Sequence, residues 1–300
     1  METRAFGKTG LSVTALGYGA MEIRGPRVWS GRPLADEDAG ALLNAVLDAG
    51  ITFIDTSSDY GRSEELIGRY LSHRRNEYIL ATKCGCFRTD CGDHDEITHV
   101  WTPENLRANL DNSLRLLRTD HVDILQLHNC PVEDFEANGL GDVLESMRKS
   151  GRIRHYGASS ARPHLQGYIG RPGFDSFQIP YSALDREHEA LISQAAAGGA
   201  GTIIRGGVGQ GEPGRGRGSE ARWAAWEAAG LDGLLEEGET RTGFVLRYTL
   251  THPDVDTVIV GTMHPRHLAE NAATVARGPL PDDVYREAKR RLSEAGINPA

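Results

Sequence analysis

Four side chains in this 300-residue sequence have the types and positions needed for proton transfer. Asp55 follows Phe-Ile, Lys83 follows Leu-Ala-Thr and His128 follows Leu-Gln-Leu, while Tyr60 comes shortly after Asp55. A nearby ammonium lowers the pKa of a phenol from its usual value of about 10, and a carboxylate keeps a buried ammonium charged. With the imidazole hydrogen-bonded to a substrate oxygen, the set predicts a general acid that protonates a developing alkoxide.

Positioning these groups together requires that the strands preceding them end at one edge of a sheet. Segments rich in β-forming residues recur at 13–16, 52–55, 78–82, 122–127, 153–158, 176–179, 202–204 and 257–260. Amphipathic segments that predict helices alternate with them, at 36–49, 63–71, 103–117, 140–149, 186–197, 222–229, 240–251 and 265–274. Apolar strands that alternate with helices predict a parallel sheet covered by helices.

Eight such units favour closure into a (β/α)8 barrel, the TIM-barrel architecture, as one domain over residues 1–300. A hairpin at 4–13 is expected before the barrel and an extra helix at 282–295 after it. The Gly-rich segment 206–218, which contains Arg215, is expected to form a lid over the catalytic rim. An open doubly wound sheet is the alternative, but no G-x-G-x-x-G motif follows its first strand.

The charge and hydropathy of the sequence limit the classes of molecule that the protein is expected to bind. With 33 Lys and Arg against 42 Asp and Glu the net charge is −9, which argues against nucleic acid or an anionic membrane surface as a partner. No apolar run approaches the roughly 20 residues that cross a bilayer, and the first residues lack a signal-peptide core. We therefore expect a cytoplasmic protein, monomeric or homo-oligomeric, with no membrane contact.

The cysteines raise the question of a metal site. Cys84, Cys86 and Cys91 lie close together in the sequence, with His94 just beyond. Their spacing, C-x-C-x4-C-x2-H, is not one of the usual zinc patterns. The sequence therefore predicts a polar loop with free thiols and no metal.

Longer motifs surround the four chemical residues. The sequence reads FIDTSSDYG, ILATK and LQLHN around them, EELIG at 64–68, GASS at 157–160, FQIPYS at 177–182 and IVGT at 259–262. In these motifs, over nearly its whole length, the chain resembles the aldo-keto reductases. The family's catalytic tetrad falls on Asp55, Tyr60, Lys83 and His128.

The resemblance implies a barrel that binds a nicotinamide cofactor without a Rossmann fold. Ser159, Ser160 and Gln178 match residues that hydrogen-bond the carboxamide, although Ser160 stands where Asn is common, and Tyr181 matches one that stacks on the nicotinamide ring. The full set of implied cofactor residues is Ala20, Met21, Asp55, Ser159, Ser160, Gln178, Tyr181, Arg205, Gly206, Gly207, Gly261, Thr262, Arg266, His267 and, at the adenine, Glu270 and Asn271.

By the same resemblance, the pyrophosphate lies between 205–207 and 261–262. Glycines allow backbone amides to approach it, and the following helix offers its N-terminus. Met263 stands where a basic residue often holds the 2′-phosphate of NADPH, whereas Arg266 and His267 one turn later offer substitutes. The expected cofactor is NADPH, with NADH as the alternative.

The expected function is reduction of an aldehyde or ketone, with Tyr60 as proton donor. Trp29 and Trp101 are candidate walls of the substrate pocket, and equally candidate packing anchors of long loops. Arg24, with two further arginines at 27 and 205, points to an anionic or polyhydroxylated substrate such as a keto-sugar. The alternatives are a Schiff-base lyase that uses Lys83 and a non-catalytic, nicotinamide-binding redox sensor.

Overall fold

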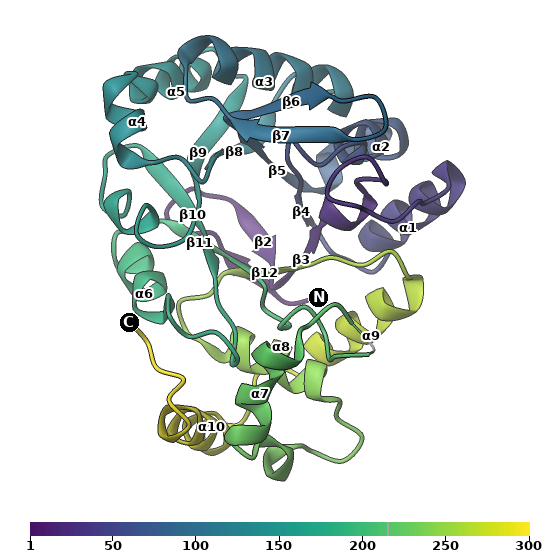
Figure 1. Cartoon of the computed structure of the whole chain (residues 1–300), viewed down its shortest axis with the longest axis vertical. Helices are drawn as coiled ribbons and strands as arrows, with labels where there is room; N and C mark the ends of the chain where they lie inside the picture. The colour runs from purple at the N-terminus through teal and green to yellow at the C-terminus, as the bar shows by residue number, and fades with distance from the viewer. Residues whose placement is uncertain (215) are drawn as a thin grey trace.

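The computed structural model describes residues 1–214 and 216–300, which form a closed barrel of eight parallel strands (Figure 1). The strands pair in chain order, and the last pairs with the first: β3 (Leu16–Gly19), β4 (Phe53–Asp55), β5 (Ile79–Cys84), β8 (Val122–His128), β9 (Ile153–Ser159), β10 (Phe174–Pro180), β11 (Gly201–Arg205) and β12 (Thr257–Val260). The predicted (β/α)8 barrel is therefore confirmed, and the open sheet is wrong.

Helices cover the outside of the barrel. The α-helices are α1 (Asp36–Asp48), α2 (Ser63–Leu71), α3 (Pro103–Leu117), α4 (Val132–Ala137), α5 (Leu140–Lys149), α6 (Glu189–Ala197), α7 (Glu220–Ala228), α8 (Arg241–Thr251), α9 (Pro265–Ala276) and α10 (Asp282–Glu294). The expected extra helix at the C-terminal end is α10, which buries Ala288 and Leu292. No helix in the described part of the chain combines the length and apolarity that a bilayer crossing needs.

An antiparallel hairpin closes the end of the barrel at which the strands begin. Its strands are β1 (Thr3–Ala5) and β2 (Ser12–Thr14), with Arg4 opposite Val13. Phe6 and Val13 are fully buried in a cluster with residues of the strands, such as Phe53 and Ile203. The prediction of a hairpin is confirmed, but that of a barrel strand at 13–16 is wrong: Val13 pairs within the hairpin, and the barrel strand begins at Leu16.

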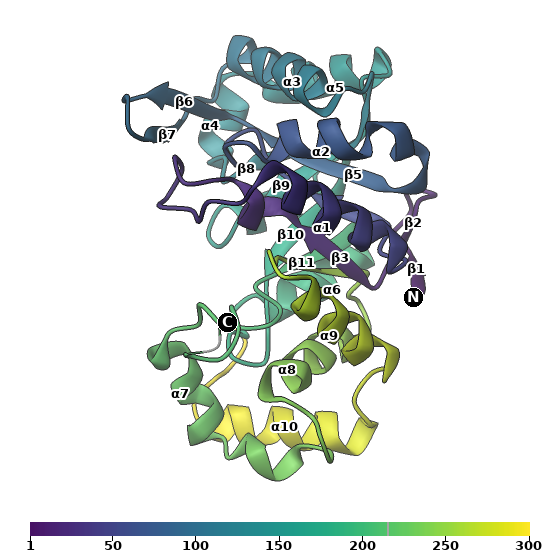
Figure 2. The same ribbon diagram turned by 90° about the vertical axis from the view of Figure 1, so that its right-hand side faces the viewer.

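A second antiparallel hairpin, absent from the prediction, extends from the opposite end of the barrel (Figure 2). Its strands are β6 (Cys86–Asp90) and β7 (Asp95–His99), where the sequence predicted a polar loop. Asn109 of α3 fastens its base, since its side chain accepts from the amide of Gly85 at 2.7 Å and donates to the carbonyl of Cys86 at 3.0 Å. Arg27 holds the far end through Asp95 and Asp90.

Candidate active site

A buried ion pair lies at the rim where β4 and β5 end. Nζ of Lys83 donates to Oδ2 of Asp55 at 2.6 Å and to the carbonyl oxygen of Thr56 at 2.7 Å, and both side chains are almost completely buried. The parallel pairing of Asp55 with Ala81 brings the ends of the two strands together. A charged pair out of contact with water is stable only when its remaining hydrogen-bonding capacity is also satisfied.

The second oxygen of Asp55 meets that requirement. Oδ1 accepts from Nε2 of Gln126 at 3.0 Å and from Nε2 of Gln178 at 2.8 Å, and Oε1 of Gln178 accepts from the hydroxyl of Ser159 at 2.8 Å. This network joins β4, β8, β9 and β10 across the barrel. Sequence reasoning missed Gln126, although a glutamine within the apolar run Leu-Gln-Leu just before His128 was the available signal.

Tyr60 lies above the ion pair, with Nζ of Lys83 4.7 Å from the centroid of its ring. Only 8% of Tyr60 is exposed, and this burial raises the pKa of its phenol to about 12, while the Lys83 charge acts in the opposite direction. The expectation that Lys83 brings the pKa below the usual value is therefore wrong for the protein alone, because desolvation outweighs the cation. Tyr60 stays protonated through the neutral range, as a proton donor must.

His128 ends β8 beside Tyr60, at a ring-centroid distance of 6.2 Å. Its Nδ1 lies 3.2 Å from Oδ2 of Asp59, 3.2 Å from Sγ of Cys86 and 3.5 Å from Oγ of Ser57. Burial alone would raise the pKa of Asp59, but the neighbouring imidazole and Ser57 hydroxyl outweigh it and hold that pKa well below its usual range. The four predicted chemical residues thus meet at one rim, with Asp59 and Cys86 as unforeseen neighbours.

The implied cofactor residues lie along the same rim. They follow the carboxyl ends of six strands or belong to α9: Ala20 and Met21 after β3, Asp55 on β4, Ser159 and Ser160 at β9, Gln178 and Tyr181 at β10, Arg205, Gly206 and Gly207 at β11, Gly261 and Thr262 after β12, and Arg266, His267, Glu270 and Asn271 on α9. In a (β/α)8 barrel this is the face that binds substrates.

Three features of this rim suit an anionic dinucleotide. A Cβ atom at Gly261 would lie 2.8 Å from the carbonyl oxygen of Gly19, so only glycine allows this close approach of β3 and β12. Within the described residues no side chain caps the N-terminus of α9, so after Pro265 the amides of Arg266 and His267 are free to meet phosphate. The side chain of Arg205 has no ion pair within residues 1–214 and 216–300. The residues therefore fit a nicotinamide dinucleotide.

Tyr181 is less accessible than its implied role requires. Its side chain is 1% exposed, and its ring packs against Tyr248 and His252 at centroid distances of 6.3 Å and 5.6 Å. Stacking on a nicotinamide ring requires one face of Tyr181 to be uncovered. Its role at the cofactor stays a prediction.

The two candidate pocket walls differ. Trp29 is 46% exposed and its ring lies 6.1 Å from that of Tyr60, so it is placed to line a pocket beside that tyrosine. Trp101 is buried and stacks on His99, and a Cβ atom at Gly85 would collide with it at 1.7 Å. Trp101 therefore anchors the hairpin β6–β7, one ring away from His128.

Two of the three arginines expected to attract an anionic substrate are engaged elsewhere. Arg24 is buried and donates to the carbonyl oxygens of Met21 and Val28, which shapes its own loop. Arg27 binds the carboxylates of the hairpin β6–β7. Arg205 remains available to an anion.

The Gly-rich segment after β11 reaches across the rim. Nη1 of Arg217 lies 2.7 Å from Oε1 of Glu22, which belongs to the short helix Ala20–Ile23 after β3. Arg215 is outside the described residues. This ion pair joins the segment after β11 to the segment after β3, and the lid function stays a prediction.

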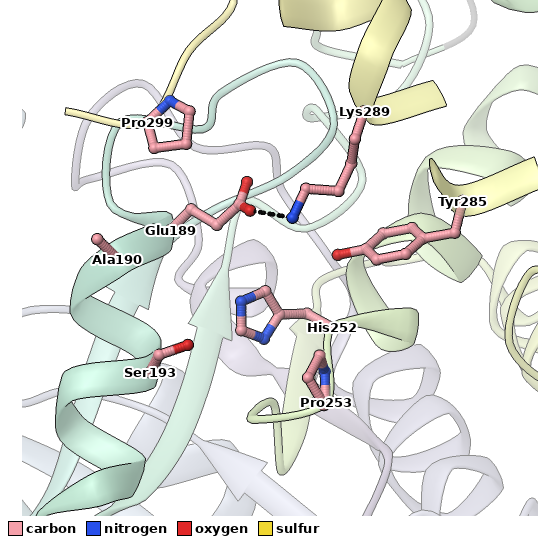
Figure 3. A pocket seen from close by; sticks show the side chains of 8 residues that line it. All are labelled: Glu189, Ala190, Ser193, His252, Pro253, Tyr285, Lys289 and Pro299. Atoms are coloured by element: carbon pink, nitrogen blue, oxygen red, sulfur yellow. Dashed lines mark ion pairs between the residues drawn. The ribbon is translucent and has the colours of Figure 1, made fainter. Parts of the chain in front are cut away.

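A separate pocket of about 320 Å³ lies outside the barrel (Figure 3). It is lined by α6, α10 and the residues that follow α8, with an ion pair between Glu189 and Lys289 at its edge. None of the four predicted chemical residues lines it. We therefore place the chemistry at the rim and not in this pocket.

The fold and the rim define a barrel oxidoreductase with a buried tyrosine, lysine and aspartate. A model described as "Aldo/keto reductase family" matches residues 15–291, so the chain belongs to the aldo/keto reductase family, whose members use nicotinamide cofactors. The holo form of the aldo-keto reductase AKR11C1 from Bacillus halodurans superposes with a TM-score of 0.84 at 27% identity, covering 97% of this chain and 96% of that one.

Two curated relatives differ in what they act on. L-galactose dehydrogenase of Arabidopsis thaliana is 28% identical over 299 residues, covering 92% of this chain and 88% of its own length. The NADH-specific methylglyoxal reductase of Escherichia coli (strain K12) is 29% identical over 205 residues, covering 63% of this chain and 61% of its own. The family is thus established, and the relatives' differing names leave the substrate and the choice of nicotinamide cofactor open.

Proposed function

We propose that this chain reduces the carbonyl group of an aldehyde or ketone to an alcohol, with NADPH as cofactor and Tyr60 as general acid. The observation that carries the proposal is the buried Lys83–Asp55 pair directly below the Tyr60 ring. The proposal assigns residues 1–300 to one catalytic domain that acts in the cytoplasm, as a monomer or homo-oligomer.

Three residues at the rim have different roles in proton transfer. A nicotinamide cofactor held at this rim would provide the hydride for reduction of the carbonyl carbon. Tyr60 gives its proton to the oxygen that becomes negative, and Lys83 stabilises the phenolate that remains. His128 orients the same oxygen through Nε2, because its described polar contacts all run through Nδ1.

The preference for NADPH rests on α9. Arg266 is largely exposed and its only ion pair among the described residues is a loose one to Glu270 at 3.5 Å, so its guanidinium is free to pair with a 2′-phosphate. His267 lies beside it on the same turn. The NADH-specific relative makes NADH the competing cofactor. Fluorescence titration decides: Arg266→Ala should weaken NADPH binding about tenfold and leave NADH binding unchanged.

The proposed substrate is a polar carbonyl compound such as a keto-sugar. Arg205 has no described ion pair, and Trp29 offers an exposed aromatic face beside Tyr60. Apolar ring faces and hydrogen-bond donors together suit a polyhydroxylated chain. The curated relative named L-galactose dehydrogenase is consistent with that class.

The geometry disfavours the Schiff-base alternative. A lysine must lose its proton to attack a carbonyl, whereas the ion pair with Asp55 outweighs the effect of burial and raises the pKa of Lys83 well above its usual value. Its side chain is also inaccessible, with Nζ engaged by Asp55 and Thr56. The family match gives no support to a non-catalytic redox sensor, and turnover measurements separate that reading from the proposal.

Replacing Tyr60 by Phe tests the proposal. Loss of the proton donor should lower kcat by about 10²–10⁴-fold, while NADPH affinity stays within about twofold. Tyr78→Phe is the matched control, because Tyr78 is also buried but precedes β5 at the opposite end of the barrel. Full activity in Tyr60→Phe would remove the acid role. Borohydride-dependent trapping of substrate on Lys83 would favour the lyase, and cofactor binding without turnover would favour the sensor.

A further inference from the structure

Four side chains beside Tyr60 offer metal-ligand atoms to one another. Asp59, Cys86, His99 and His128 each present one such atom, and these atoms all lie within 4.8 Å of each other. Only His128 belongs to the predicted catalytic set. Cys91 and His94, which lie close to Cys86 in the sequence, are on the exposed turn between β6 and β7. They are not part of this cluster.

The fold brings the four residues together from three separate segments. Cys86 and His99 are direct cross-strand partners in the hairpin β6–β7, an arrangement that sets their Cβ atoms about 5 Å apart. Asp59 lies in the connection between β4 and α2, and His128 ends β8. Three rigid attachments therefore hold the ligand atoms before any ion binds.

Two of the ligand-atom distances are close to those of tetrahedral coordination. Zinc binds nitrogen or oxygen at about 2.0–2.1 Å and thiolate sulfur at about 2.3 Å, so ligand atoms in a tetrahedron lie about 3.3–3.6 Å apart. Nδ1 of His128 lies 3.2 Å from Oδ2 of Asp59 and 3.2 Å from Sγ of Cys86. The remaining distances, none longer than 4.8 Å, would have to shorten by side-chain rotation when an ion binds.

Asp59 supplies an independent sign of a missing cation. The residue is 1% exposed, and its ion-pair partner among the described residues is His128, at 3.2 Å, which is itself a member of the cluster. Neither carboxylate oxygen makes a hydrogen bond of normal geometry within the described residues. A buried carboxylate without such partners is costly. The nearest ammonium, that of Lys83, is engaged by Asp55 and Thr56. A divalent ion would satisfy Asp59 and balance the negative charges of one carboxylate and one thiolate.

We propose that Asp59, Cys86, His99 and His128 bind one Zn²⁺, or a divalent transition-metal ion of similar softness, at the rim of the barrel. A thiolate with two imidazoles selects such ions over Mg²⁺ and Ca²⁺. Binding displaces the thiol proton of Cys86 to solvent. If His128 acts as under the proposed function, coordination at Nδ1 leaves its proton on Nε2, the nitrogen that faces the substrate oxygen in that mechanism.

Cobalt provides the direct test, because tetrahedral Co²⁺ absorbs strongly in the visible region and a cobalt–thiolate bond adds a near-ultraviolet band. Chelator-treated full-length protein should bind one Co²⁺ with both signatures, and Zn²⁺ should displace it. This measurement needs neither NADPH nor turnover, so its result is independent of the reductase assignment. Absence of the thiolate band, or no stoichiometric binding, would overturn the proposal.

Matched variants on the same hairpin locate the ion. His99→Ala removes an exposed ligand with little risk to folding and should weaken Co²⁺ binding at least about tenfold, while Cys86→Ser should abolish the thiolate band. His94→Ala and Cys91→Ser change the same residue types on the exposed turn and should leave both signals unchanged. Loss of binding in the turn variants, with retention in His99→Ala, would place the metal elsewhere and refute the site.

Discussion

The two hairpins of this protein have the same topology and different roles. The hairpin β1–β2 lies at the end where the barrel strands begin, and β6–β7 lies at the opposite end, where the strands finish (Figure 2). The first contributes Phe6 and Val13 to the barrel interior. The second is largely exposed, and within residues 86–99 only Cys86 and Asp95 are buried.

The contrast separates stability from chemistry within one fold. The hairpin β1–β2 buries apolar surface, which stabilises the folded state and has no part in the chemistry. The hairpin β6–β7 contributes little to the core and instead sets a thiol and an imidazole beside His128. In (β/α)8 barrels generally, the end where the strands begin contributes stability and the end where they finish carries the active site.

Phe6→Ala should produce the largest effect on stability. Removing a fully buried aromatic ring from the barrel interior should lower the free energy of unfolding by about 3–5 kcal/mol. Activity per folded molecule and Co²⁺ binding should be unchanged, because the rim is at the other end. Chemical denaturation together with a kinetic assay checks both. Phe87→Ala, at an exposed position on β6, is the control. A larger loss of stability in the control would abolish the distinction between the hairpins.

Glu64 tests how the rim side of the barrel wall responds to pH. It is buried, accepts from the hydroxyl of Thr82 at 2.6 Å, and its pKa is raised by burial from 4.5 to about 7. The folded state therefore favours the neutral acid. This stabilisation is complete below pH 4.5 and is lost as the pH rises through about 7, a change of up to about 3 kcal/mol.

Glu64→Gln should remove that pH dependence, since an amide keeps the neutral form. Denaturation of both proteins between pH 5 and 8, in roughly half-unit steps, gives the difference, which should grow in favour of the variant as the pH increases. A constant difference over this range would show that Glu64 does not change protonation on unfolding.

Arg27→Ala should have the smallest global effect. Arg27 pairs with the exposed Asp90 and the buried Asp95 at the outer part of the hairpin β6–β7. Because this hairpin contributes little to the core, loosening it should cost little overall stability. Hydrogen exchange of amides at 86–99 should nevertheless accelerate, because the hairpin loses its tie to the loop after β3. Arg88→Ala, whose distance to Asp95 is 3.7 Å, is the control and should exchange at the normal rate. Equal acceleration in both variants would contradict the anchoring role.

The sequence predicted those parts of the fold that carry strong local signals. The bounds of α3 follow from Thr102 and Pro103, a hydroxyl cap and a first-turn proline, and the structure shows the side chain of Thr102 accepting from the amide of Asn105. The buried strands that carry Asp55, Lys83 and His128 at or next to their last residue are rich in the β-forming residues that predict strands. Because all strands of a parallel barrel end at the same rim, the barrel prediction by itself implied that these three side chains lie close together.

What could not be predicted depends on contacts between distant residues. The strand β6 is exposed after Cys86 and packs no apolar face against the core. Its sequence therefore lacks the alternation of apolar and polar residues that would predict a strand paired with β7. His99 lies in none of the recognised motifs, and Asp59, although part of FIDTSSDYG, has no sequence feature that pairs it with His128. The pKa of Tyr60 depends on the balance between burial and the Lys83 charge, and the sequence reveals the cation but not the extent of burial.

The pairing of Cys86 with His99 has a consequence for how this region can change during evolution. In an antiparallel ladder a shift of one residue turns every side chain to the other face, so a single insertion within β6 or β7 would separate the pair. The turn at 91–94 is under no such constraint and can lengthen freely. Length variation among descendants of this sequence should therefore accumulate at the tip and spare the two strands.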